Sequence, residues 1–156
     1  MQINDCKRVR RLHMVGIGGA GMSGIAEVLH ENGFVVTGSD MGEGSVIDYL
    51  KHLGIRVDSK HEAKNVEDAD LVVYSSAIPY DNPELVEARA RRIPVIRRAE
   101  MLGELMRMKY TLAISGTHGK TTTTSIVGEI WEAAQKWARG ITSLPKVTSL
   151  TAASSP

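Results

Sequence analysis

Only one cysteine, Cys6, occurs in the 156 residues of this chain, and neither sign of charge is in clear excess. A lone cysteine cannot form a disulfide within the chain. The formal net charge of +1 indicates no general attraction to nucleic acid or to a membrane surface. Long apolar runs are also missing, because glycines interrupt the apolar stretch that follows the basic start at residues 1–11. We therefore expect no signal peptide, no membrane insertion and a cytoplasmic protein.

The residues that are present predict an α/β fold. Hydrophobic residues make up 42% of the chain and charged residues 24%, enough for one ordinary domain with a core. Apolar runs of strand length alternate with segments of helical spacing. We expect strands near residues 12–17, 34–40, 55–57, 69–74 and 93–96, and helices near 25–32, 45–53, 82–90 and 99–108. This alternation predicts a Rossmann-like parallel sheet in a first domain over residues 1–107.

A glycine-rich turn follows the first expected strand. Gly16, Gly18 and Gly21 form the pattern G-x-G-x-x-G, in which the glycines make a tight turn, admit a diphosphate and let helix pack on strand. Asp40 ends the next expected strand, about twenty residues later, where an acid would bind a ribose hydroxyl. Strand, turn, helix, strand and acid occur in the order that nucleotide binding requires. The pattern therefore predicts a nucleotide site, and its ligand stays open.

Two weaker candidates lie further along. Residues 75–78 follow the expected strand at 69–74, and the hydroxyls of Ser75 and Ser76 could contact a nucleotide there, although an ordinary turn fits nearly as well. His61 lies in a polar stretch, which favours a surface histidine. The arginines between residues 89 and 98 interleave with acids and lack aromatic neighbours, so we expect a solvated face rather than a nucleic-acid surface.

A second glycine-rich stretch, at residues 115–124, has the features of a phosphate loop. It follows an apolar run at 110–114, which we expect to form a strand, and precedes a helix expected to reach about residue 139. Its glycines would turn backbone N–H groups toward an oligophosphate, Lys120 adds a positive charge, and Thr121 offers a hydroxyl to Mg²⁺. ATP or GTP is the expected ligand. The match to a full Walker loop is partial, because Ile114 stands where that loop has glycine.

Too few residues follow this loop to complete the sheet that a phosphate-loop domain needs. We therefore expect residues 108–140 to be the start of an incomplete ATP-binding domain. Residues 141–156 are mostly Ser, Thr, Ala and Leu, with neither strand nor helical periodicity. They are expected to form a disordered tail.

The two loops in this order, together with residues 75–78 and 97–102, resemble the Mur ligases over roughly residues 8–134. The family's ATP loop lacks the early Walker glycine, so Ile114 agrees with it. The resemblance implies an ATP-dependent ligation in peptidoglycan synthesis. The carboxylate of UDP-N-acetylmuramate would take the γ-phosphate, and the amine of L-alanine would attack the acyl phosphate.

The resemblance also assigns site residues. Those implied for the UDP substrate are Gly16, Gly18, Gly19, Ala20, Gly21, Met22, Asp40, His61, Ser75, Ser76, Ala77 and Ile78. Those implied for ATP are Gly116, Thr117, His118, Gly119, Lys120, Thr121 and Thr122. Lys120 would be catalytic, stabilising the β- and γ-phosphates, and Thr121 would hold Mg²⁺. Because the family pattern stops near residue 134, the chain is expected to be truncated or frame-shifted and inactive alone.

Two other classes of function remain open. A nicotinamide-dependent oxidoreductase fits the first glycine turn and Asp40 equally well, but leaves the second loop unexplained. The other class is a non-enzymatic module, in which the chain is a fragment that binds only a UDP-sugar or a partner protein.

Overall fold

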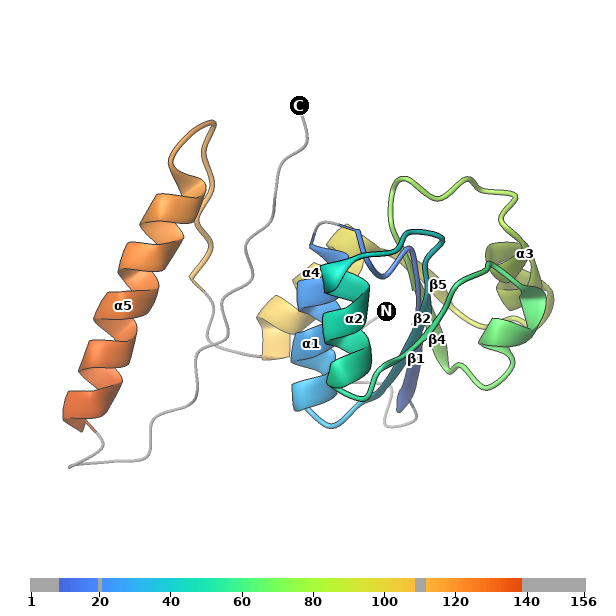
Figure 1. Cartoon of the computed structure of the whole chain (residues 1–156), viewed down its shortest axis with the longest axis horizontal. Helices are drawn as coiled ribbons and strands as arrows, with labels where there is room; N and C mark the ends of the chain where they lie inside the picture. Colours follow the sequence, from blue (N-terminus) through green and yellow to red (C-terminus); the bar gives the residue numbers. More distant parts are fainter. Residues whose placement is uncertain (1–8, 20, 109–111, 139–156) are drawn as a thin grey trace. The chain divides into compact units, whose positions relative to one another are not determined.

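The structure is a computed structural model, and it describes residues 9–19, 21–108 and 112–138. The chain divides into two compact units, residues 1–110 and 111–156. We call them the sheet unit and the loop–helix unit, and describe each by itself (Figure 1). The expected tail at 141–156 lies outside the described residues.

The sheet unit is built on five parallel strands in the order β3-β2-β1-β4-β5. The strands are β1 (Arg11–Val15), β2 (Val35–Ser39), β3 (Arg56–Asp58), β4 (Leu71–Tyr74) and β5 (Val95–Arg97). The chain moves outward from β1 to β3 and then crosses back to β4 on the other side of β1. Such a reversal defines the switch point of an open α/β sheet, here between β1 and β4. The expected Rossmann-like parallel sheet is confirmed.

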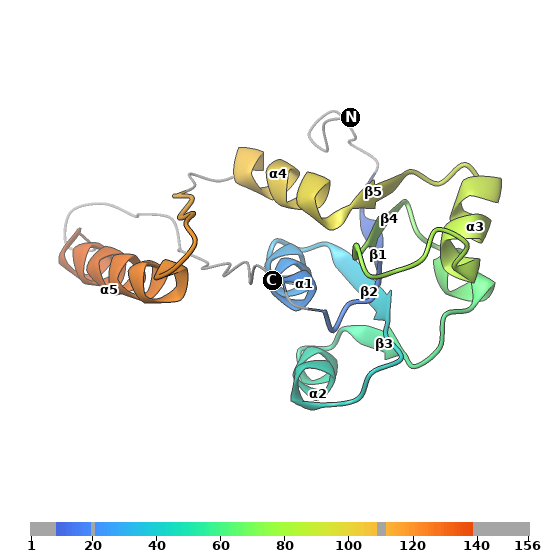
Figure 2. The same ribbon diagram turned by 90° about the horizontal axis from the view of Figure 1, so that it is seen from above.

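Helices cover both faces of this sheet (Figure 2). On one face lie α1 (Met22–Glu31), α2 (Ser45–His52) and α4 (Arg98–Met108). On the other lie α3 (Pro83–Ala90) and a short 3₁₀ turn, η2 (Ala63–Val66), which contact each other. Helix α3 begins with Pro83 in its first turn, and the Asn82 side chain caps it by accepting from the backbone N–H of Glu84.

The central strand β1 is buried on both sides, which explains its nearly continuous apolar sequence. Leu12, Met14 and Val15 are fully enclosed. Toward α3, Val15 and Val72 pack with Leu85 in one cluster. This packing leaves little freedom to the residues that follow β1 and β4.

The loop–helix unit has no comparable core. The expected helix is present as α5 (Lys120–Ala138), and it begins at the loop lysine, inside the stretch 115–124. None of residues 112–134 is buried, and the apolar side chains of Ile126 and Ile130 are 55% and 64% exposed. The prediction of a strand at 110–114 is wrong for Leu112, Ala113 and Ile114, which are not in a strand. Residues 110 and 111 lie outside the described part of the chain. A strand requires a neighbour for its backbone groups, and the described residues supply none here.

We predict that hydrogen exchange will separate the two units. Backbone amides of β1 and β4 should be strongly protected, whereas those of α5 should exchange almost as fast as in a free helical peptide, because none of the side chains described at residues 120–134 is buried. Exchange followed by mass spectrometry on the full chain measures both at once. Protection of residues 120–130 comparable to that of β1 would contradict this picture.

Candidate functional site

The strands end in register, so the residues after them share one edge of the sheet. Val15 pairs with Ser39 on one side and with Tyr74 on the other, and Tyr74 pairs with Arg97. The next residue in each segment therefore lies at what we call the carboxyl edge; these residues are Gly16, Asp40, Ser75 and Arg98. Ligands of open parallel sheets bind outside this edge, at the switch point.

The glycine turn at residues 16–21 leads directly from β1 into α1. Gly16 and Gly21 both have φ of 76°, a left-handed conformation that favours glycine. The N–H of Gly19 donates to the Gly16 carbonyl at 3.1 Å, and a Cβ at Gly19 would lie 3.2 Å from that oxygen. No side chain caps α1, and its first turn contains no acid. The N–H groups of Met22 and Ser23 donate to the Gly19 carbonyl at 2.9 and 3.4 Å, so it is mainly the positive end of the helix dipole that favours an anion there. Ala20 lies outside the described residues.

Asp40 anchors the glycine turn. Its Oδ2 accepts from the N–H of Gly18 and its Oδ1 from the N–H of Gly42, each at 2.8 Å. A Cβ at Gly18 would lie 2.7 Å from Ile47 Cδ1 and 2.9 Å from Oδ2, so a side chain there would displace one or both of these groups. Each carboxylate oxygen keeps a second lone pair, which leaves Asp40 able to accept from a ribose hydroxyl.

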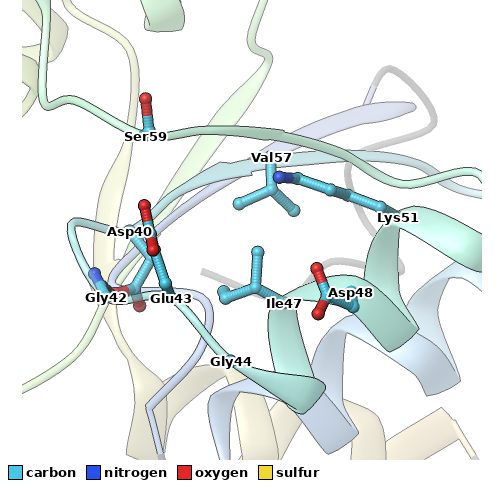
Figure 3. Close-up of a pocket in the computed structure, with 9 residues that line it drawn as sticks. All are labelled: Asp40, Gly42, Glu43, Gly44, Ile47, Asp48, Lys51, Val57 and Ser59. Carbon is cyan, nitrogen blue, oxygen red and sulfur yellow. Dashed lines mark hydrogen bonds between the residues drawn. The ribbon is translucent and has the colours of Figure 1, made fainter.

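Beside Asp40 lies a cavity of about 480 Å³ between the β2–α2 loop, α2 and β3 (Figure 3). Its lining combines apolar and charged side chains; the lining residues are Asp40, Gly42, Glu43, Gly44, Ile47, Asp48, Lys51, Val57 and Ser59. Three carboxylates face one ammonium group there, so this cavity suits the nucleoside end of a ligand better than its phosphates.

Residues 75–78 form a turn packed on the glycine turn. The Ser75 N–H donates to the Val15 carbonyl, and the Ile78 N–H donates to the Ser75 carbonyl. A Cβ at Gly16 would lie 3.1 Å from the Ile78 side chain and 3.3 Å from Ser75 Cβ. The structure thus brings Ser75 and Ile78 to the expected site, whereas Ser76 and Ala77 lie exposed on the outer part of the turn.

Behind the carboxyl edge lies a buried polar cluster around Glu84. Glu84 Oε2 accepts from Ser39 Oγ at 2.6 Å and lies 3.0 Å from His61 Nδ1. Glu84 Oε1 accepts from Asn65 Nδ2 at 2.6 Å and lies 3.4 Å from His13 Nε2. The interpretation of His61 as a surface histidine is wrong, because its side chain is only 10% exposed. The deprotonated carboxylate only accepts, so Nδ1 of His61 carries a proton and Nε2 is left for other contacts.

Burial alone would raise the pKa of Glu84. Hydrogen bonds from His13, Ser39 and Asn65 stabilise the charged form and outweigh that effect, so the pKa lies below its ordinary value of 4.5. The His13 contact, at 3.4 Å, is the longest of these three. This carboxylate connects β1 and β2 to α3 and η2. It therefore fixes the position of β2, the strand that leads into Asp40.

The phosphate-loop candidates all lie in the loop–helix unit. Lys120 Nζ donates to the carbonyl of Gly116 at 2.5 Å and to that of Thr117 at 3.3 Å, which leaves one of its three donors without a partner among the described residues. Gly119 has φ of 76°, and its carbonyl accepts from the N–H of Thr123. Thr121 stands exposed in the first turn of α5. These residues fit an oligophosphate with Mg²⁺, since an ammonium group and an exposed threonine lie at a helix start.

Within the described ranges, no three His, Cys, Asp or Glu side chains gather closely enough to hold a metal ion. The helices of those same ranges include none that is long and apolar enough to cross a membrane.

The fold and the carboxyl edge define a Rossmann-like unit with a candidate nucleotide site, followed in the chain by a candidate phosphate loop. The family model described as "Mur ligase family, catalytic domain" matches residues 11–110. The chain belongs to the Mur ligase family, as its two loops predict.

Similar proteins carry one particular name within this family. A UDP-N-acetylmuramate–L-alanine ligase of Xanthobacter autotrophicus is 61% identical over 122 residues, which are 78% of this chain and 26% of that protein. The corresponding ligase of Rhodospirillum rubrum is 58% identical over 79% of this chain and 26% of its own length. The crystal structure of the ligase from Thermotoga maritima matches with a TM-score of 0.75 and 39% identity, covering 81% of this chain and 30% of that one. The chain thus spans about a quarter of the length of these curated relatives.

We predict that Glu84→Gln weakens the sheet unit at neutral pH and flattens its response to acid. A carboxyl whose pKa is lowered by folding stabilises the fold above its ordinary value of 4.5, and loses that contribution as pH falls through the lowered folded-state value. Loss of the charged hydrogen bonds should reduce the free energy of unfolding by about 1–3 kcal/mol at pH 7. Urea unfolding between pH 3 and 7 measures both effects.

The matched control is Glu87→Gln in the same helix, where the carboxylate pairs with Arg91 near solvent. It should change stability by less than about 1 kcal/mol. Asp70, whose pKa is also lowered because backbone N–H groups outweigh the effect of burial, accounts for some acid response that remains in both variants. Equal acid slopes in the Glu84 and Glu87 variants would show that Glu84 has no such role.

Proposed function

We propose that the sheet unit, within residues 1–107, binds the UDP part of UDP-N-acetylmuramate. The glycine turn at the switch point carries this proposal, because it places the start of α1, which has no side-chain cap, next to the acid that follows β2. The names of the similar ligases support the choice of substrate. In this reading the diphosphate lies on Gly16, Gly18, Gly19, Gly21 and Met22.

The remaining assigned residues surround that position. Asp40 accepts from the ribose, and Ser75 supplies a hydroxyl from the turn that packs on the glycines. His61, held at Nδ1 by Ser39 and Glu84, presents Nε2 as an acceptor. The three further candidates contribute shape or backbone contacts; they are Ser76, Ala77 and Ile78.

We further propose that residues 108–140 begin an ATP-binding domain and that the intact protein joins L-alanine to UDP-N-acetylmuramate in the cytoplasm, in peptidoglycan synthesis. Lys120 would stabilise the β- and γ-phosphates of ATP, Thr121 would hold Mg²⁺, and the neighbouring loop residues 116–119 and 122 would cradle the phosphates. Mg²⁺ would supply neutralisation of phosphate charge. Phosphoryl transfer depends mainly on positioning and charge, which is what a loop of this kind provides.

A nicotinamide cofactor is the second candidate ligand of the sheet unit. Asp40 at the end of β2 favours it, because an acid there suits the ribose of NAD as well as that of UDP.

We expect UDP-N-acetylmuramate to bind the chain more tightly than NAD does. The reason is that the UDP-sugar offers a diphosphate to the glycine turn and a sugar to the Ser75 turn without a second nucleoside to accommodate. Calorimetric titration of both ligands on the full chain decides the matter. Tighter binding of NAD would reject the substrate assignment.

We also predict that a polypeptide of these 156 residues forms no UDP-N-acetylmuramoyl-L-alanine. No side chain of residues 112–134 is buried, so the phosphate loop lacks the rigid support that positioning requires, and poor positioning removes several orders of magnitude in rate. For the same reason ATP should bind weakly. Product formation above the level of a Lys120→Ala variant, or micromolar ATP affinity, would prove this wrong.

A further inference from the structure

We propose that Arg98 is the cation that binds the diphosphate at the glycine turn. This inference rests on the proposed nucleotide site of the sheet unit and names a residue that its sequence motif does not contain. The sequence predicts that the arginines between residues 89 and 98 form a solvated face. Arg98 departs from this prediction, because it is half-buried.

The register of the sheet places Arg98 at the carboxyl edge. Tyr74 pairs with Arg97, so Arg98 follows β5 where Ser75 follows β4 and Gly16 follows β1. From the first residue of α4 its side chain lies along the glycine turn. A Cβ at Gly21 would lie 2.8 Å from Arg98 Nη1, 3.8 Å from Cζ and 4.0 Å from Cδ. The guanidinium and its stem therefore cover the last glycine before α1.

The charges around Arg98 favour an anion there. Arg11, Arg56, Arg91 and Arg107 each pair with a carboxylate, whereas Arg98 has no such partner among the described residues. Arg98 is also half-buried, which makes an uncompensated charge costly. The adjacent start of α1 has no acid in its first turn, and the helix dipole there also favours negative charge. One guanidinium group can bind two phosphate oxygens. A diphosphate would therefore compensate the Arg98 charge and also interact with the start of α1.

The two ends of the turn differ in charge, and this orients the ligand. At Gly18 the backbone N–H already donates to the Asp40 carboxylate, which repels phosphate. At Gly21 the neighbouring group is the Arg98 guanidinium. The nucleoside therefore lies toward Asp40 and its cavity, and the diphosphate lies toward Arg98.

The test compares ligands that differ only in phosphate. Binding of UDP-N-acetylmuramate, UDP and uridine to the full chain is measured by calorimetry for the unchanged protein and for Arg98→Ala and Arg98→Lys, after thermal unfolding has shown that each variant is folded. For Arg98→Ala we expect affinity for the two diphosphates to fall about 10- to 100-fold, the effect of losing a hydrogen bond to a charged group. Affinity for uridine should change less than about 2-fold. For Arg98→Lys we expect diphosphate affinities between those of the unchanged protein and those of Arg98→Ala, because lysine keeps the charge without the planar fork.

Arg97→Ala is the matched control. It removes the same charge at the neighbouring position, where the Arg97 side chain donates to the Tyr74 hydroxyl. It should alter diphosphate affinity less than about 2-fold. Equal losses in the Arg97 and Arg98 variants, or equal losses for UDP and uridine, would overturn the assignment. If Arg98→Ala does not fold, the ratio of UDP to uridine affinity in Arg98→Lys decides, and an unchanged ratio rejects the proposal. Failure of the unchanged chain to bind any UDP ligand would instead reject the nucleotide site itself.

Discussion

The common register in which the parallel strands end is the constraint on which the rest of this structure depends. Hydrogen bonding aligns Val15 with Ser39 and with Tyr74, so the segments that leave these strands start side by side. A shift of one residue in either pairing would turn the following side chains to the opposite face. The glycine turn, the acid at the end of β2 and the serine turn after β4 form one site only because that alignment holds.

Two kinds of interaction fix the alignment of the strands on the α3 face of the sheet. Apolar packing of Val15, Val72 and Leu85 supplies the bulk of the burial, and it tolerates modest changes of shape. The Glu84 cluster is stricter, because a buried carboxylate is stable only while its partners stay in place. It joins residues from four separate segments. Removal of any one partner leaves a charge with incomplete compensation directly behind the site.

The sequence was sufficient for features whose signals are local. The alternation of strands and helices, the turn at Gly16 and the acid at Asp40 follow from spacing and residue type within short windows. The Glu84 cluster and Arg98 were not predictable in this way, since their neighbours are distant in sequence and meet only through the sheet order. The expected strand at residues 110–114 failed at its described positions for the opposite reason. A locally suitable sequence cannot form a strand without a partner.

The bond between Asp40 and the Gly18 backbone has a kinetic consequence. The protein's own carboxylate holds the glycine turn at Gly18, between the left-handed Gly16 and Gly21, so the cost of ordering the turn is met during folding rather than at the moment of binding. A ligand then meets a surface that is already shaped. Association at such a surface is governed by diffusion and by electrostatic attraction, and differences in affinity among related ligands arise mainly from how fast each one leaves.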